Sequence, residues 1–191
     1  MEIGIIGISS LTIDLAGRAS QAGFSVIINN PKGGSLIRDC IEKMGTDVRL
    51  GSLDQAAAPS LIVLFLPKEN LEDTIQKLPD MSGKTVLHAS GLISDAQTLH
   101  TGITKAMAYQ NTASLLPAAH MVKLFNAAPF GSDRINGQEE KKEELFFMGG
   151  CSDSRSKTAA FLKKLQFLPV DLSFRLQLQN SWISRVSHPT E

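Results

Sequence analysis

The chain has 191 residues, of which 42% are hydrophobic, so it is long enough to bury one sizeable core. Its 19 Lys and Arg residues balance 19 Asp and Glu residues, which leaves no excess positive charge to bind nucleic acid or an anionic membrane. The longest apolar run, residues 61–66, is too short to cross a membrane, and no secretion signal precedes the first predicted strand. We therefore expect a soluble, cytoplasmic protein that binds a small molecule.

The first 28 residues predict a strand, a helix and a second strand. Residues 2–8 are rich in isoleucine, and Ser9 and Ser10 are candidate helix caps before apolar residues that recur at helical spacing. Gly23 ends this helix, and residues 24–28 are again apolar and β-branched. A unit of this kind joins two parallel strands by a right-handed crossover.

The same alternation continues along the chain. Further helices are predicted at residues 34–44, 53–57, 70–78, 113–120 and 152–166, the last with Ser152 or Asp153 as its cap. Further strands are predicted at residues 46–50, 61–66, 85–88, 122–125, 145–148 and 168–171. A polar loop is expected at residues 131–142, whereas residues 91–112 give no clear pattern.

This order of elements is typical of a doubly wound α/β fold of the Rossmann type, with a mostly parallel sheet and helices on both faces. No linker or repeat divides the chain, so we expect one dinucleotide-binding domain over residues 1–172 and a tail of uncertain structure over residues 173–191. In such a sheet the ligand lies at the carboxyl ends of the strands, where the strand order reverses.

A turn that begins at Gly7 has the position of a phosphate-binding turn. In that turn, a first glycine permits the tight bend, a second admits the pyrophosphate, and a third lets the helix pack closely. Here the three positions hold Gly7, Ser9 and Thr12. We interpret Gly7, Ser9, Ser10 and Leu11 as residues that hold pyrophosphate at the helix amino terminus, where N–H groups favour an anion. An ordinary strand-to-helix turn is the alternative.

The second strand ends in Asn29, Asn30, Pro31 and Lys32. NAD-binding folds usually place Asp or Glu here, where it holds the ribose 2′-hydroxyl. This chain has a cation and no acidic residue, an arrangement that tolerates a 2′-phosphate and favours NADP over NAD. A surface turn with a solvated lysine is the alternative.

Four stretches of the chain resemble the deazaflavin-dependent NADP oxidoreductases and their relatives, which include the cytoplasmic reductase domains of six-transmembrane ferric reductases. The stretches are GIIGISSLTIDLAGRASQAGFSVIINNPKGGSL, LIVLFLPKEN, VKLFNAAP and ELFFMGGCSDSRSKTAAFLKKLQFLPVDL. Together they extend over most of residues 1–172. Ser9 and Thr12 replace glycines of the family, and residues 88–92 differ from its usual Asp-containing segment, which bears on cofactor affinity more than on the fold.

The resemblance implies which residues contact the cofactor and the substrate. The implied NADP-binding residues are Asn29, Asn30 and Lys32 at the 2′-phosphate, Leu66 and Pro67 along the adenosine ribose and nicotinamide, and His88 and Ser90 beside the nicotinamide. Lys32 stands where the family usually has arginine, which keeps the charge and loses the bidentate geometry. Phe125 and Asn126 match a Phe-Asn pair near the flavin-like substrate.

Hydride transfer between NADPH and a flavin-like ring requires no general acid, because the cofactors carry the chemistry. We therefore name no catalytic residue. His88 is a candidate to tune a ring or donate a proton, since the ordinary pKa of histidine lies near working pH, and a hydrogen-bonded structural histidine is the alternative.

The histidines and cysteines give a metal site no support. No two histidines have the spacing of a ligand pair near carboxylates, and Cys40 and Cys151 match no zinc or CxxC spacing. Free thiols suit a reducing compartment. Cys151, just before a predicted helix, is expected either to have a lowered pKa or to be an incidental thiol.

Three functional hypotheses follow. The favoured one is an NADP-dependent oxidoreductase that acts on a flavin, a deazaflavin or a similar small-molecule redox partner. The second is a non-catalytic Rossmann-type domain, in which the altered turn at Ser9 and Thr12 leaves a nucleotide sensor or an interaction module. The third is a dehydrogenase half whose pocket is completed by another chain, as in a homodimer, because 191 residues leave little room for a separate substrate domain.

Overall fold

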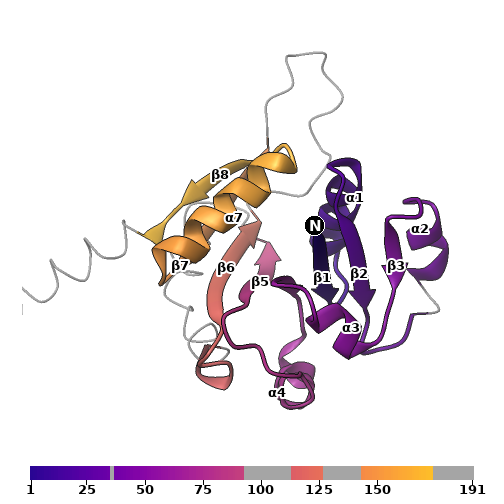
Figure 1. Cartoon of the computed structure of the whole chain (residues 1–191), viewed down its shortest axis with the longest axis horizontal. Helices are drawn as coiled ribbons and strands as arrows, with labels where there is room; N and C mark the ends of the chain where they lie inside the picture. The colour runs from indigo at the N-terminus through magenta and orange to yellow at the C-terminus, as the bar shows by residue number, and fades with distance from the viewer. Residues whose placement is uncertain (35–36, 93–112, 127–142, 174–191) are drawn as a thin grey trace, which may run out of the picture.

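The computed structural model describes residues 1–34, 37–92, 113–126 and 143–173 (Figure 1). Its strands are β1 (Glu2–Ile6), β2 (Ser25–Asn29), β3 (Val48–Leu50), β4 (Leu61–Leu64), β5 (Thr85–Leu92), β6 (His120–Asn126), β7 (Glu144–Gly149) and β8 (Leu168–Asp171). Its helices are α1 (Ser10–Gln21), α2 (Arg38–Glu42), α3 (Leu53–Ala57), α4 (Lys68–Gln76) and α7 (Ser152–Lys164).

The strands form one sheet in the order β3-β2-β1-β4-β5-β6-β7-β8. Neighbouring strands are parallel except β6 and β7, which are antiparallel. The expected doubly wound, mostly parallel α/β fold is therefore confirmed. The order reverses between β1 and β4, because the chain crosses from β3 at one edge back to β4 beside β1. This reversal opens a crevice at the carboxyl ends of β1 and β4.

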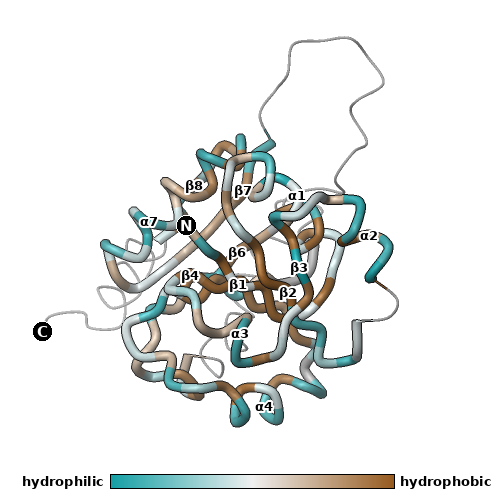
Figure 2. Tube along the Cα trace, turned by 45° about the vertical axis from the view of Figure 1, so that its right-hand side comes forward, coloured by the Kyte–Doolittle hydropathy of each residue, from teal (hydrophilic) through white to brown (hydrophobic). Residues whose placement is uncertain are grey.

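Helices cover both faces of the sheet. On one face, Leu15 of α1 and Phe161 of α7 pack against Ile5 and other strand residues. On the opposite face, Ala56 of α3 and Ile75 of α4 pack against a second set of strand residues. Figure 2 shows the consequence, with hydrophobic colour along the central strands and hydrophilic colour on the outer sides of α2 and α4. Strands buried on both faces explain the continuous apolar runs in the sequence.

Most of the predicted elements are present, and α3 and β8 have the bounds expected from the sequence. Ser9 is the N-cap of α1, as predicted. α2 is shorter than expected, and β5 continues beyond His88 to Leu92. The polar loop, residues 93–112 and residues 174–191 of the tail lie outside the described residues.

Two predictions at helix ends were wrong. Of the helix predicted at residues 113–120, only residues 113–115 are helical, and β6 begins at His120. Pro117 explains the difference, because proline lacks an N–H donor and disfavours helical backbone at the preceding residue. The N-cap of α7 is Cys151, not Ser152 or Asp153, and its side chain makes no capping hydrogen bond.

Candidate functional site

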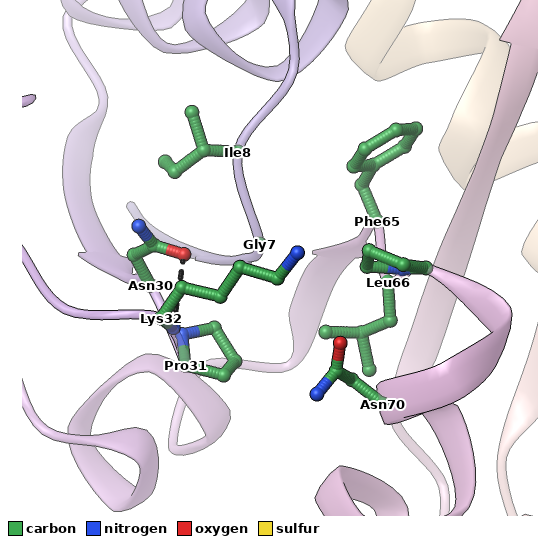
Figure 3. Close-up of a pocket in the computed structure, with 9 residues that line it drawn as sticks. Gly7, Ile8, Asn30, Pro31, Lys32, Phe65, Leu66 and Asn70 are labelled. Atoms are coloured by element: carbon green, nitrogen blue, oxygen red, sulfur yellow. Dashed lines mark hydrogen bonds between the residues drawn. The ribbon is translucent and has the colours of Figure 1, made fainter.

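A pocket lies at the crevice where the strand order reverses (Figure 3). Three turns line it, one after each of β1, β2 and β4. The lining residues are Gly7, Ile8, Asn30, Pro31, Lys32, Phe65, Leu66, Pro67 and Asn70. The pocket therefore lies where the sequence places a ligand, and it brings together Gly7, Asn30, Lys32, Leu66 and Pro67 from the predicted site.

Gly7 is required by the backbone of this turn. Its φ is +91°, and a Cβ added there would lie 1.6 Å from the carbonyl oxygen of Phe65. The Gly7 N–H donates to the carbonyl of Asn29 at 2.8 Å, and the Phe65 N–H donates to the carbonyl of Ile6 at 2.8 Å. These bonds hold the ends of β1, β2 and β4 together, so the first glycine position sets the floor of the pocket.

Ser9 and Thr12 form a capping box at the start of α1. The Thr12 N–H donates to Ser9 Oγ at 3.2 Å, and the Ser9 N–H donates to Thr12 Oγ1 at 2.8 Å. Thr12 is fully buried. Its Oγ1 lies 3.1 Å from the carbonyl oxygen of Ser9 and 3.3 Å from that of Gly7, so the hydroxyl can donate to either. Two of the N–H groups that a phosphate would use at a helix amino terminus are therefore already paired within the turn.

Ser10 and Leu11 lie between Ser9 and Thr12, and their N–H groups are outside the capping box. No described residue accepts a hydrogen bond from the N–H of Ser10 or Leu11. Ser10 is exposed, whereas the side chain of Leu11 is buried in the core and presents only its backbone to the turn. Of the predicted pyrophosphate residues, Ser10 and Leu11 thus have N–H groups that no described residue occupies.

The turn after β2 is shaped by Asn30. Its side-chain oxygen accepts from the Lys32 N–H at 3.3 Å, and its amide donates to the carbonyl of Gly33 at 2.6 Å. Figure 3 shows the exposed Lys32 side chain extending from this turn toward Gly7. No described carboxylate forms an ion pair with Lys32. The ammonium is therefore available to an anionic ligand at this end of the pocket.

Asn29 has a different role from Asn30. Its side-chain amide donates to the carbonyl of Gly51, just beyond β3, at 3.0 Å, and Asn29 is not among the residues that line the pocket. Sequence reasoning grouped the two asparagines because they are adjacent. Consecutive residues at the end of a strand point to opposite sides, so only one of them reaches the pocket.

Apart from Pro31, which lies between the predicted Asn30 and Lys32, three lining residues were not predicted from the sequence. Ile8 and Phe65 form apolar walls, and Asn70 projects from the first turn of α4 toward the pocket (Figure 3). Asn70 ends the stretch LPKEN that carries part of the family resemblance, so a signal for it was present. Ile8 and Phe65 lie in apolar runs that also predict strand, and no local signal separates the two roles.

His88 lies away from the pocket lining and is 7% exposed. Burial, with a further contribution from the charge of Lys123, lowers the pKa of His88 to about 4. The expectation of a titrating group near working pH was therefore wrong, because His88 is a neutral imidazole at pH 7. Its Nδ1 atom is buried and has no hydrogen-bond partner among the described residues.

The remaining predicted residues lie on β5 and β6. Ser90 pairs with Phe125 in the sheet, and Asn126 is the last residue of β6. The Phe125 side chain is 1% exposed and packs with Leu172, apart from the pocket. Phe125 and Asn126 thus lie on β6, on the far side of β5 from the pocket residues that follow β1, β2 and β4.

Other candidate features carry less chemistry. The nearby backbone N–H groups of Ser154 and Asp153, at the start of α7, lower the pKa of the Cys151 thiol, in the direction expected before a helix. Among the described residues there is no group of three potential metal ligands. No helix in the described part of the chain is long and apolar enough to cross a membrane.

Neither a protein-family model nor a curated protein sequence matches the chain. Among solved structures, a hypothetical protein from Sinorhizobium meliloti has a TM-score of 0.71 and 26% identity, over 91% of this chain and 85% of that one. A protein assigned as an F420 dependent NADP reductase from Arthrobacter has a TM-score of 0.60 and 16% identity, over 96% and 92% of the two chains.

Arogenate dehydrogenase from Synechocystis has a TM-score of 0.60 and 16% identity, over 91% of this chain and 60% of the dehydrogenase. The chain thus corresponds to about 60% of the length of that enzyme. At 16% identity, the likeness to the reductase and the dehydrogenase shows a shared fold.

Proposed function

We propose that the chain is an NADP-dependent oxidoreductase that transfers a hydride between NADP(H) and a small redox partner such as a flavin or deazaflavin. The observation that carries the proposal is the pocket at the reversal of strand order, which joins the Gly7 turn to a second turn that holds Lys32 and no carboxylate. The F420 dependent NADP reductase with the same fold adds support, since its name joins the two redox partners proposed here.

The residues of the pocket fit one end of NADP well. A Cβ at Gly7 would overlap the backbone of Phe65, so the turn keeps a glycine where a dinucleotide fold needs a close bend. The Lys32 ammonium supplies the positive charge that a 2′-phosphate requires, and Asn30 fixes the backbone from which it extends. The turn fits the pyrophosphate less fully, because the N–H groups of Ser9 and Thr12 each donate to the side-chain oxygen of the other residue.

When bound, NADPH supplies the hydride from its reduced nicotinamide. The chain binds, orients and excludes water around the reacting groups. Lys32 selects the phosphorylated ribose, the N–H groups of Ser10 and Leu11 bind phosphate oxygens, and the apolar side chains of Phe65 and Leu66 keep water from one wall of the pocket. No side chain of the pocket is required to transfer a proton.

A comparison of NADPH and NADH tests this proposal. NADPH should raise the melting temperature of the full chain more than NADH does, and Lys32→Ala should abolish the difference. Loss of one charge-assisted hydrogen bond corresponds to about a 10-fold to 100-fold change in Kd. Lys77→Ala is the matched control, because Lys77 is an exposed lysine at the end of α4 and lies outside the pocket lining.

Further arms decide the outcome. Lys32→Arg should keep the preference for NADPH, because the charge remains. Equal shifts with both nucleotides, or no shift with either, would overturn the proposal. Oxidation of NADPH by a flavin or deazaflavin in the presence of the wild-type chain would establish the hydride transfer.

One observation favours the alternative of a non-catalytic domain. The capping box pairs two of the N–H groups at the amino terminus of α1, which reduces what the turn offers to pyrophosphate. In that case the chain binds nucleotide weakly and acts as a sensor or interaction module. NADPH turnover by the wild-type chain argues against it, whereas tight binding that appears only after the capping box is removed supports it.

A further inference from the structure

His88 and Lys123 lie side by side in the sheet and outside the pocket lining. They are direct partners in the parallel pairing of β5 with β6, and Leu64, the last residue of β4, pairs with His88 on the other side. Partners in a sheet project from the same face. His88 is 7% exposed and Lys123 is 5% exposed, so two ionisable side chains share one buried row.

This row has hydrogen-bond donors and no counter-charge in the described part of the chain. His88 Nδ1 is buried, and no residue in the described ranges forms a hydrogen bond with it. Lys123 is in none of the ion pairs between described residues, and the ring of Phe125, 5.2 Å from its ammonium, is the aromatic group beside it. A buried ammonium is costly unless an anion pairs with it. Burial lowers the pKa of Lys123, and an anion beside the row would stabilise the charged ammonium.

The position of the row separates it from the nucleotide end of the pocket. Lys32 follows β2, and three strand-to-strand steps separate β2 from β5. At ~4.8 Å for each step, His88 lies about 14 Å across the sheet from the strand that leads to Lys32. In a doubly wound sheet the dinucleotide crosses the reversal point, so β5 and β6 belong to the half opposite the Lys32 turn.

We propose that His88 and Lys123 together bind a carboxylate of the small-molecule redox partner. A carboxylate has two acceptor oxygens, one for the ammonium and one for an imidazole N–H, which matches two donors on adjacent strands. Its single negative charge balances one lysine, whereas a phosphate dianion carries an excess. This inference rests on the proposed function for the identity of the ligand as a redox partner, and it narrows that partner to an acid.

Acetate is the probe for the site, and NMR of the histidine ring carbons in the full-length chain is the readout. The His88 signal is the one that His88→Gln removes. Acetate should shift it in a saturable manner, whereas acetamide, the uncharged analogue, and chloride at equal ionic strength should not. Inorganic phosphate is a separate arm, and a stronger response to phosphate than to acetate would overturn the assignment to a carboxylate.

Lys123→Met keeps the length and volume of the side chain and removes its charge. It should weaken the acetate response about tenfold, the loss expected for one charge-assisted hydrogen bond. Lys84→Met is the control, because Lys84 donates to the carbonyls of Ala57 and Ala58 and faces other elements. Lys123→Gln is a second variant for the case in which the methionine disturbs folding.

The result separates this inference from the proposed function. The inference fails if acetate leaves the His88 signal unchanged, if acetamide acts equally, or if the response survives both Lys123 variants. NADPH binding is measured in the same samples, so a chain that prefers NADPH and ignores acetate overturns only the carboxylate site. A chain that binds acetate and no nucleotide overturns only the proposed cofactor.

Discussion

Replacing Thr12 by valine separates the structural role of the capping box from its effect on a ligand. Valine keeps the branched shape of threonine, so the buried site is not left with a cavity. The change removes the oxygen that accepts from the Ser9 N–H at 2.8 Å and the hydroxyl proton within reach of two carbonyls. The bond from the residue-12 N–H to Ser9 Oγ remains, so half of the cap is kept.

The expected loss in the free energy of unfolding is about 1 to 2 kcal/mol, because one partly buried N–H group loses its partner. The same change frees that N–H for a phosphate oxygen. If pyrophosphate lies over this turn, NADPH should bind up to about tenfold more tightly to Thr12→Val than to the wild type. Urea unfolding followed by circular dichroism gives the first quantity, and quenching or enhancement of NADPH fluorescence gives the second.

Thr158→Val is the matched control. Thr158 is also buried in a helix, and its hydroxyl donates to the carbonyl of Ser154 at 2.7 Å. This variant should lose stability without a change in NADPH affinity. If Thr12→Val leaves both stability and NADPH affinity at wild-type values, the capping box is neither a significant stabilising feature nor a barrier to the ligand, and our reasoning is refuted.

Two further predictions concern the backbone and pH. Gly7→Ala should reduce the free energy of unfolding by ~3 kcal/mol or more, because its Cβ would overlap the Phe65 carbonyl. Gly23→Ala should reduce it by only about 1 kcal/mol, because Gly23 has a φ of +80° but no atom near the added Cβ. Urea unfolding of both variants checks the difference, and equal losses would contradict it. The pKa of His88 falls from 6.5 to about 4 in the folded state, so the unfolded chain binds its proton first, and stability should decrease by about 3 kcal/mol as pH falls through this interval. His88→Gln should make the stability profile flatter between these pH values, and an equally steep decline in that variant would count against the effect.

Much of the fold was predictable because parallel strands buried on both faces leave continuous apolar runs in the sequence. The stretch at Leu61–Leu64 is the clearest example, and Ser9 marks the start of α1 through its own side chain. Helix ends were less predictable, because several residues compete to cap them. Cys151 takes the cap position of α7 although two better cap formers follow it, since the path of the chain from β7 decides where the helix begins.

The candidate site was also predictable in part. Gly7 and Lys32 are recognisable because each follows a strand and has a distinctive property, a positive φ at Gly7 and a charge at Lys32. The difference between Asn29 and Asn30 was not predictable, because the direction of a side chain at the end of a strand depends on the neighbouring strand. Here the side chain of Asn29 donates to the carbonyl of Gly51, whereas Asn30 lines the pocket.

The sequence by itself determined the doubly wound α/β fold and the position of a pocket beside Gly7, because hydrophobic periodicity and turn residues are local properties of the chain. Only the tertiary structure decided which side chains meet. It brought Lys32 into the same pocket as Gly7, and it brought His88 beside Lys123 on two neighbouring strands. Their register depends on packing between segments far apart in the sequence, and burial then made His88 neutral and left Lys123 without a carboxylate among the described residues.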